Sequence, residues 1–269
     1  MPTIPHDYHM HSNSSIDSEA TMAEMCEAAL QNEVGEIAFA EHYDCHPDDY
    51  GTGYYDPETY FARLEEARRE YQPLGLTVRA GVELGEPHLF ADTQQPTLAA
   101  WPYDIVLGSL HWIGPHSVFD DDYYQQRTPA EAITPYFVEL AEMVRAGGFD
   151  VLAHADVVKR VACRVYGSFD ITQCETEIRN VWQACIETGT AIEINTAGLR
   201  TAANEQHPSQ VALQWYYEMG GRLLTTGSDA HRPTHVALGL VSALDLAREV
   251  GFTQVCIYEK REVTRWVEI

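Results

Sequence analysis

The stretch Asp7-Tyr8-His9-Met10-His11 sets the pattern that the rest of the chain repeats, a short β-strand that ends in side chains of metal-binding type. Residues i and i+2 of a strand point to the same side, so His9 and His11 can aim both rings at one point. Imidazole is the commonest metal-binding side chain. Two hydrogen-bonded or exposed histidines would show the same pattern, so the remaining strands have to decide between a metal site and ordinary histidines.

Beyond this first strand the chain alternates apolar, β-like runs with helical segments. Capping residues mark two helix starts: Thr21 and Glu24 form a capping box, and Asp56 precedes Pro57. We expect strands over residues 36–40, 77–82, 104–110, 150–153, 191–195 and 222–226, and a last short extended piece over 253–258. The expected helices span residues 22–32, 57–71, 88–99, 129–146, 173–187, 210–218 and 235–250.

This β-then-α series predicts an α/β fold with a parallel sheet and right-handed crossovers. Seven such units without a linker rich in proline, glycine or serine favour a closed, TIM-like barrel in one domain, residues 1–269. An open, doubly wound sheet is the alternative, but no GxGxxG follows the first strand and no GxxxxGK[ST] occurs in the sequence. A loop over residues 114–127 has the length of a lid or binding loop, or is an exposed insertion.

Composition limits the partners and the compartment. The net charge is −24 and the only lysines are Lys159 and Lys260, which makes a poor surface for nucleic acid. No apolar run has the length of a transmembrane helix, and residues 1–7 lack the blocks of a signal peptide. The six cysteines form no CxxC pair, which indicates free thiols. We expect a cytoplasmic monomer or small homo-oligomer that acts on a small molecule, without nucleic acid or membrane.

Residues of metal-binding type lie at or just after the carboxyl end of every predicted strand except the sixth. In a (β/α) barrel these ends open on one face, where active sites are built. Residues far apart in the sequence would therefore converge there. The predicted ligands are His9, His11, Asp17, His42, Glu83, His111, His154, Asp229 and His231.

This inventory exceeds the roughly four ligands of one tetrahedral zinc site. It fits two or three divalent ions that share a bridging carboxylate, and mixed nitrogen and oxygen ligands suit Zn, Mn or Fe(II). For the remaining histidines we expect ordinary core or surface roles; they are His6, His46, His88, His116, His207 and His235.

Two arginines follow the fifth and sixth strands in a chain with few cations. Neighbouring metal ions commonly serve the hydrolysis of phosphate esters, which also needs a cationic clamp for the phosphate. Arg160 and Arg200 are candidates, because guanidinium groups make planar, bidentate contacts with phosphate oxygens. Asn195, at the end of the sixth strand, is a further candidate for substrate binding. Surface arginines in salt bridges are the alternative.

Together these residues resemble the pattern of the polymerase and histidinol phosphatase (PHP) superfamily over essentially the whole chain. The resemblance implies a distorted (β/α)7 barrel that binds up to three metals. The implied ligand sets are His9, His11, Glu83 and Asp229 for one metal, Glu83 with His111 and His154 for a second, and Asp17, His42 and His231 for a third.

Within the superfamily the chain is most similar to the monofunctional histidinol-phosphatases. The stretches that carry this likeness are residues 108–112, residues 153–156 with Arg160, residues 193–200 and residues 207–209. Trp112, Ala155 and His207 depart from the Phe, Leu and Tyr expected at these positions.

The resemblance implies that L-histidinol phosphate is hydrolysed to L-histidinol and phosphate, a step of histidine biosynthesis, by a hydroxide that bridges two metals. Arg160 and Arg200 would stabilise the phosphate oxygens, and Asp17 or His231 would protonate the leaving alkoxide. Acidic or aromatic residues over 43–55 and 120–124 would hold the substrate's imidazole and ammonium. The alternative is a PHP phosphoesterase that acts on another small phosphate ester or nucleotide.

Overall fold

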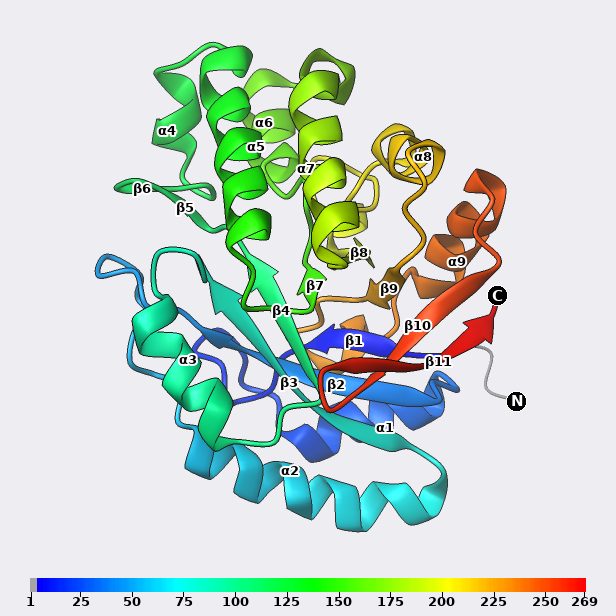
Figure 1. Ribbon diagram of the computed structural model, residues 1–269. Coiled ribbons are helices and arrows are strands. Elements are labelled where there is room, and N and C mark those ends of the chain that lie inside the picture. Colours follow the sequence, from blue (N-terminus) through cyan, green and yellow to red (C-terminus); the bar gives the residue numbers. More distant parts are fainter. Residues whose placement is uncertain (1–3) are drawn as a thin grey trace.

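A seven-stranded parallel sheet forms the centre of the molecule (Figure 1). The computed structural model describes residues 4–269. Residues 1–7 are predicted to lack the features of a signal peptide, and the first three of them lie outside the described range. Neighbouring strands in space follow one another along the chain. The strands are β1 (Asp7–Met10), β2 (Glu36–Tyr43), β3 (Thr77–Gly85), β4 (Ile105–Ser109), β7 (Val151–Leu152), β8 (Ala191–Asn195) and β9 (Leu224–Gly227).

The first and last strands of this sheet meet near their carboxyl ends. Met10 forms a parallel bridge with Ala230. Asp229 donates its backbone N–H to the carbonyl oxygen of His9 at 2.7 Å, and His11 donates to Ala230 at 2.9 Å. The sheet is therefore a nearly closed barrel, which confirms the predicted fold class over an open, doubly wound sheet.

Helices cover the outside of the barrel (Figure 1), and their apolar faces pack on the strands in one large core. The predicted capping box of Thr21 and Glu24 starts α1, and Asp56 caps α2 before Pro57. The helices are α1 (Met22–Gln31), α2 (Pro57–Tyr71), α3 (Ala91–Ala100), α4 (Asp121–Gln125), α5 (Pro129–Ala146), α6 (Lys159–Tyr166), α7 (Glu175–Thr188), α8 (Gln210–Glu218) and α9 (Leu240–Val250). Short 3-10 turns are η1 (Gln72–Leu74), η2 (Ile171–Cys174), η3 (Ala197–Arg200) and η4 (Pro233–His235).

A second, smaller apolar cluster fills the inside of the barrel. Ala38 and Ala40 of β2 and Leu107 of β4 belong to it. Because side chains alternate between the two faces of a strand, residues two positions further along these strands also face the axis. The inner cluster therefore forms the base on which polar side chains at the strand ends stand.

An antiparallel hairpin of β10 (Gln254–Glu259) and β11 (Glu262–Glu268) covers the amino-terminal end of the barrel, shown in orange to red in Figure 1. Ile257 of β10 is fully buried in the inner cluster. The Arg261 guanidinium lies 2.9 Å from the carboxylate of Asp150, which precedes β7. The hairpin thus closes the end opposite to the strand ends that carry the candidate ligands.

The segment expected as one loop over residues 114–127 contains secondary structure. The short strands β5 (Trp112–Ile113) and β6 (His116–Ser117) pair antiparallel, and α4 follows them. Tyr124 is fully buried and donates its hydroxyl to the carbonyl oxygen of Val118. Burial of aromatic side chains therefore orders a segment whose polar sequence suggests an irregular loop.

Other departures concern the chain after the fifth strand. Helix α6 and strand β11 were not predicted, because α6 is only eight residues long and β11 is largely exposed. Helix α9 begins at Leu240 and not at residue 235, because Gly239 adopts a left-handed conformation with φ 87°. These differences lie outside the barrel strands.

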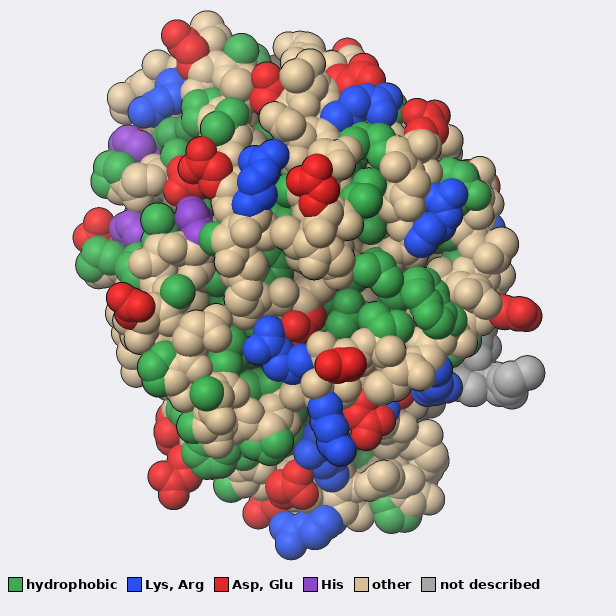
Figure 2. Space-filling model, viewed as in Figure 1, with side chains coloured by type: hydrophobic (Ala, Val, Ile, Leu, Met, Phe, Trp, Pro, Cys, Tyr) green, Lys and Arg blue, Asp and Glu red, His purple; other side chains and the backbone are tan. Residues whose placement is uncertain are grey.

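Within residues 4–269, no helix has the length and apolar character needed to cross a membrane. The face of the molecule in Figure 2 carries acidic and basic side chains next to one another, with apolar and uncharged surface between them.

Truncation of Ile257 to Ala should lower the free energy of unfolding by about 2–5 kcal/mol, because it opens a cavity at the closed end of the barrel. Arg265→Ala, on the exposed strand of the same hairpin, should cost about 1 kcal/mol or less. Urea unfolding of the two variants measures the difference. Equal losses would contradict the closing role of β10.

Candidate active site

The register of the barrel brings candidate ligands from neighbouring strands to one level. Ala40 belongs to the inner cluster, so His42, two residues further along β2, also faces the axis. Glu83 of β3 is in register with His42, and Leu107 of β4 is in register with Glu83. Parallel strands in register present these side chains side by side at the mouth of the barrel.

The fully buried carboxylate of Glu83 is the centre of the site. Five imidazoles surround it, three near Oε2 and two near Oε1. From Oε2 the distances are 3.3 Å to His9 Nε2, 3.7 Å to His11 Nε2 and 3.0 Å to His42 Nδ1. From Oε1 they are 2.9 Å to His154 Nε2 and 3.5 Å to His111 Nε2.

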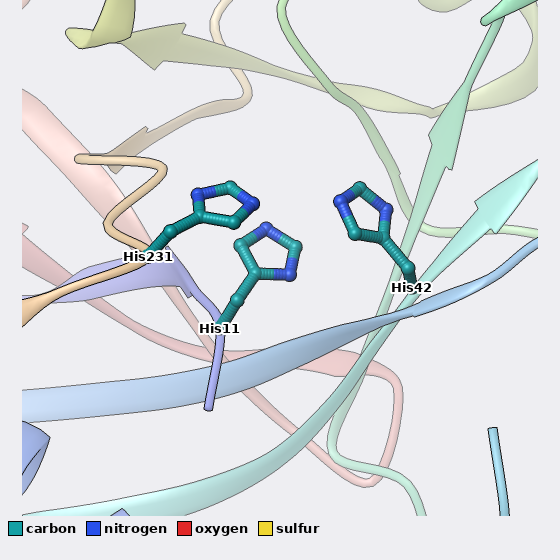
Figure 3. Close-up of side chains that lie close together, drawn as sticks. All are labelled: His11, His42 and His231. Atoms are coloured by element: carbon teal, nitrogen blue, oxygen red, sulfur yellow. The ribbon is translucent and has the colours of Figure 1, made fainter. Parts of the chain in front are cut away.

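Two further carboxylates complete the cluster through His231. Asp17 Oδ2 lies 2.9 Å from His231 Nε2 and 3.5 Å from His42 Nε2. Asp229 Oδ1 lies 3.5 Å from His231 Nδ1 and 3.6 Å from His11 Nε2. Figure 3 shows that the rings of His11, His42 and His231 approach one another from separate segments of the chain. The structure therefore brings all nine predicted ligands together.

Several buried atoms of this cluster have no hydrogen-bond partner within residues 4–269; they include His9 Nε2, His11 Nε2, His42 Nδ1 and Glu83 Oε2. Nearly all buried polar atoms in native proteins are paired. Tetrahedral ligands that bind zinc at 2.0–2.2 Å lie roughly 3.4 Å apart, which is the spacing found here. Overlapping trios such as His9, His11 and Glu83 place their ligand atoms within 4.8 Å of one another. The cluster fits divalent metal ions.

Burial and neighbouring charges set the protonation of these groups. Burial raises the pKa of Glu83, but His9 and His42 outweigh this effect and hold the pKa well below its usual range. Burial, together with the charges of His231 and His42, lowers the pKa of His11 to about 3. Glu83 is therefore an anion and His11 a neutral imidazole, which are the forms that bind metal ions. Neighbouring carboxylates raise the pKa of His9 and His42 despite their burial, so a metal ion that bound these two rings would displace their protons.

A cavity of about 510 Å³ opens beside the cluster. Most of the predicted ligands contribute to its lining, and Arg160 lies in the same wall. The outer part of the lining is acidic and aromatic, and includes Asp48, Asp49, Tyr50, Trp112, Phe119 and Asp120. The lining therefore combines buried residues of metal-binding type with more exposed acidic and aromatic residues that suit a cation or an aromatic ring.

The two candidate arginines take different positions. Arg160 Nη2 donates to Asp229 Oδ2 at 2.9 Å. Arg200 is absent from the cavity lining found among residues 4–269, and its Nη2 donates to the carbonyl oxygens of Ser228 and Asp229. Nη1 of Arg200 has no partner within the described chain, so it keeps free donors. Arg160 is the better placed of the two to meet a substrate.

Asn195 is fully buried behind His9. Its amide nitrogen lies 3.4 Å from His9 Nδ1, and its Oδ1 accepts the backbone N–H of Ala197. The structure does not bring this side chain to the cavity. Its predicted contact with substrate stays a prediction, and in this position its amide nitrogen donates to Oε2 of Glu193, the carboxylate that lies 2.9 Å from His9 Nδ1.

The PHP domain family matches residues 7–197, which hold β1 to β8 and seven of the nine candidate ligands. The chain belongs to the PHP domain family. A probable histidinol-phosphatase of Clostridium acetobutylicum is 27% identical over 256 residues, which are 95% of this chain and 97% of the relative. A histidinol-phosphatase of Lactococcus lactis subsp. lactis is 25% identical over 261 residues and 96% of each chain.

Among solved structures, this PHP domain is similar to the histidinol phosphate phosphatase of Lactococcus lactis subsp. lactis in complex with zinc, L-histidinol and phosphate. The TM-score is 0.88 at 24% identity, with 97% of this chain and 99% of that chain covered. The structure of a putative histidinol phosphatase from Listeria monocytogenes has a TM-score of 0.77 at 17% identity, with 88% and 99% covered. At these identities the likeness supports the barrel fold.

Sequence reasoning missed buried carboxylates of this PHP domain that contact the ligand histidines through Nδ1, the ring nitrogen that does not face Glu83. Glu193 Oε1 lies 2.9 Å from His9 Nδ1, and Oε2 accepts the backbone N–H of His154 at 3.0 Å. Asp44 Oδ1 lies 3.4 Å from His111 Nδ1. Alternation along the sixth strand could have indicated Glu193, because it shares a face with the strand end. Asp44 lies in the range 43–55 that is expected to hold the substrate, but no sequence pattern indicated its contact with His111.

The backbone is strained at two candidate ligands. His154 has φ 21° and Asp229 has φ 53°, values that are rare for residues with a side chain. Gly227 allows a close approach here, since a Cβ would lie 2.0 Å from Glu193 Oε1 and 2.4 Å from His9 Cβ. Strained backbone persists where surrounding structure enforces it, and it concentrates at functional sites.

The other histidines mostly have the ordinary roles expected for them. His6 is buried, and its Nε2 accepts the backbone N–H of Thr226 at 3.0 Å. The ring of His46 stacks on Trp112 with centroids 4.1 Å apart. His207 is also buried and hydrogen-bonded, but one of its partners is Arg160 at the cavity wall.

Replacement of Glu83 by Gln should remove bound metal from more than one position, because an amide is a far weaker ligand than the carboxylate that five imidazoles share. Metal content per chain, measured by elemental analysis after zinc loading and desalting, is expected to fall by at least about half. Glu86→Gln is the matched control, since this buried carboxylate accepts backbone N–H groups of His111 and Trp112. Equal metal content in the Glu83 variant and the wild type would contradict the assignment.

Proposed function

We propose that this PHP domain is a metal-dependent phosphomonoesterase that hydrolyses L-histidinol phosphate to L-histidinol and phosphate. The observation that carries the proposal is the composition of the cavity lining. It combines the imidazole and carboxylate cluster and Arg160 with more exposed acidic and aromatic residues. A small ester with a phosphate at one end and a cationic, aromatic alcohol at the other matches both.

The relatives support this choice of substrate. Proteins named histidinol-phosphatase or probable histidinol-phosphatase match more than nine-tenths of this chain and of their own length. The similar structure from Lactococcus lactis was solved with zinc, L-histidinol and phosphate. We carry these ligands over as a proposal, because the sequence identity is low.

We propose two to three divalent ions (Zn, Mn or Fe) at the cluster, as a trinuclear centre when all positions are filled. When bound, such ions supply an activated water and neutralise charge on the phosphate. The residues that would hold them are His9, His11, Asp17, His42, Glu83, His111, His154, Asp229 and His231, with Asp44 as an additional candidate beside His42 and His111.

Arg160 would bind the phosphate oxygens from the cavity wall. Its Nη2 donates to Asp229 at 2.9 Å and its Nε donates to His207 at 3.3 Å, which leaves Nη1 and the second N–H of Nη2 for the substrate. Arg200 would add charge from behind Asp229 through its free Nη1. Both act most strongly in the transition state, where negative charge spreads over the equatorial oxygens.

Asp17 and His231 lie in the cavity lining as a pair 2.9 Å apart. The Nε2 atom of His231 is where a proton can be held for the leaving alkoxide, with Asp17 as its partner. Asp17 and His231 are therefore our candidates for the general acid when no metal ion is bound to them, because His231 Nε2 cannot hold a proton and a metal ion at the same time.

The acidic part of the cavity lining would bind the ammonium of the substrate. Within residues 4–269, the carboxylates of Asp48 and Asp120 make no hydrogen bond or ion pair that would neutralise them. Asp49 accepts the indole N–H of Trp112 at 2.8 Å and His46 stacks on one face of the ring, which leaves the other face for an imidazole of the substrate. This wall distinguishes an amino alcohol from a sugar or a nucleoside.

We further propose that residues 1–269 act as one unit, a cytoplasmic monomer or small homo-oligomer that binds neither nucleic acid nor membrane. The continuous barrel and the hairpin that closes its far end support one unit. The net charge of −24 supports a small substrate over a nucleic acid.

Phosphate release from L-histidinol phosphate, compared with a panel of nucleotides and sugar phosphates, tests the proposed reaction. We expect kcat/KM for histidinol phosphate to exceed every other value by at least about 10-fold. Chelation should abolish the activity, and Zn or Mn should restore it. Comparable rates across the panel would favour the alternative, a PHP phosphoesterase of other specificity.

Replacement of Asp120 by Asn should raise KM for histidinol phosphate about two- to fivefold, because it removes one exposed charge from the acidic part of the cavity lining. The same change at Asp48 should act in the same direction. KM for glycerol phosphate, which has no amine, should stay constant. Asp121→Asn is the matched control, since Asp121 pairs with Arg164 outside the cavity. Equal shifts for both substrates would contradict ammonium recognition.

A further inference from the structure

Arg160 is held from two sides at the cavity wall. Nη2 donates to Asp229 Oδ2 at 2.9 Å, and Nε donates to Nε2 of His207 at 3.3 Å. A long, flexible side chain with a single contact keeps most of its rotamers, whereas two contacts at different nitrogens define the plane of the guanidinium. His207 therefore contributes to the direction in which the remaining donors of Arg160 point.

The proton on Nδ1 of His207 leaves Nε2 free to accept the hydrogen bond from Arg160. Nδ1 lies 2.5 Å from Asp156 Oδ1, and a carboxylate can only accept, so Nδ1 carries the proton. Nε2 of a neutral ring is then left as an acceptor for Arg160. Burial lowers the pKa of His207 to about 4 despite the neighbouring Asp156, which keeps the ring neutral near pH 7.

Asp156 and the backbone of His207 are themselves fixed. Asp156 Oδ2 accepts from the backbone N–H of Ser209 at 2.9 Å and lies 3.2 Å from the Lys159 ammonium. His207 exchanges two backbone hydrogen bonds with Asn195, of 2.7 and 2.8 Å, at the end of β8. Asp156, Lys159 and His207 are all nearly inaccessible to solvent. This buried chain links β8 and the start of α6 to the cavity wall.

We propose that Asp156 and His207 are positioning residues that hold the guanidinium of Arg160 in the orientation that binds the substrate phosphate. The inference rests on the proposed phosphatase function for its consequence in catalysis, but the contact itself does not. The competing explanation is that Asp156 and His207 only stabilise the packing of α6 against the barrel. The two explanations differ in whether loss of His207 acts through Arg160.

Two isosteric substitutions separate the two bonds of His207. Asn places its amide where Nδ1 lies, so His207→Asn keeps the contact with Asp156 and loses the acceptor for Arg160. Gln reaches the position of Nε2, so His207→Gln keeps an acceptor for Arg160 and loses the contact with Asp156. The positioning role predicts that the Asn variant is the more damaged in phosphate binding, whereas a packing role predicts no such order.

The affinity of the zinc-loaded protein for inorganic phosphate, measured by calorimetry, provides the first measurement. We expect His207→Asn to weaken binding by about 10- to 100-fold, the range for a hydrogen bond that involves a charged group, with unchanged zinc content. In the Arg160→Ala background the same substitution should cost less than about twofold, because its target is gone. In the Asp120→Asn background, on the other wall, its effect should remain complete. Equal effects of His207→Asn with and without Arg160 would overturn the proposal.

Nuclear magnetic resonance tests the contact without any turnover. In the wild-type protein the proton of His207 should reside on Nδ1, and a proton on Nε2 would overturn the proposal even if no variant folds. The Arg160 Nε–H signal, assigned by its absence in Arg160→Lys, should exchange with solvent at least about 10-fold faster in His207→Asn than in His207→Gln. Failure of the wild type to hydrolyse histidinol phosphate would refute the proposed function and leave these two signals to decide the positioning role.

Discussion

One buried carboxylate, that of Glu83, constrains the rest of this structure. An isolated charge in a protein interior is strongly destabilising unless cations or hydrogen bonds surround it. The five imidazoles around Glu83 can carry positive charge or bind ions that do, and Ser109 also donates its hydroxyl to Oε1. The barrel is therefore built to bring histidines from separate strand ends to one point. Divalent ions at this point would remove the remaining electrostatic cost.

The support for this arrangement has two parts. At the mouth, the buried carboxylate of Glu193 holds the ring of His9 and accepts the backbone N–H of the strained residue His154. The strained backbone of Asp229 is held by its hydrogen bond to the carbonyl oxygen of His9. At the far end, the β10–β11 hairpin closes the inner cluster with Ile257. The closed end of the barrel and the buried side chains around the ligands together keep the ligand atoms at a common spacing. In the proposed function, the more exposed part of the cavity lining provides the specificity for substrate.

Much of the fold and of the ligand set was accessible to prediction, for local reasons. The capping box at Thr21 and the Asp56-Pro57 pair mark helix starts through contacts between residues three positions apart or fewer. The β5–β6 pair and α4 were missed because burial of Tyr124, which depends on tertiary packing, orders them. Asp44, Glu193 and the Asp156–His207 pair were missed for a related reason. They contact ligands or Arg160 across sequence separations of about 40 to 180 residues.

Local patterns in the sequence predict the seven strands of the barrel and the metal-binding residues near their ends, because alternation within a strand and capping at a helix start are properties of short segments. The way in which these residues share the carboxylate of Glu83 depends on tertiary contacts. The tertiary structure also decided that Arg160 enters the cavity wall, that Arg200 stays behind Asp229 and that Asn195 lies behind His9. These outcomes depend on barrel closure and strand register, which fix the direction of each side chain relative to strands that are distant in sequence.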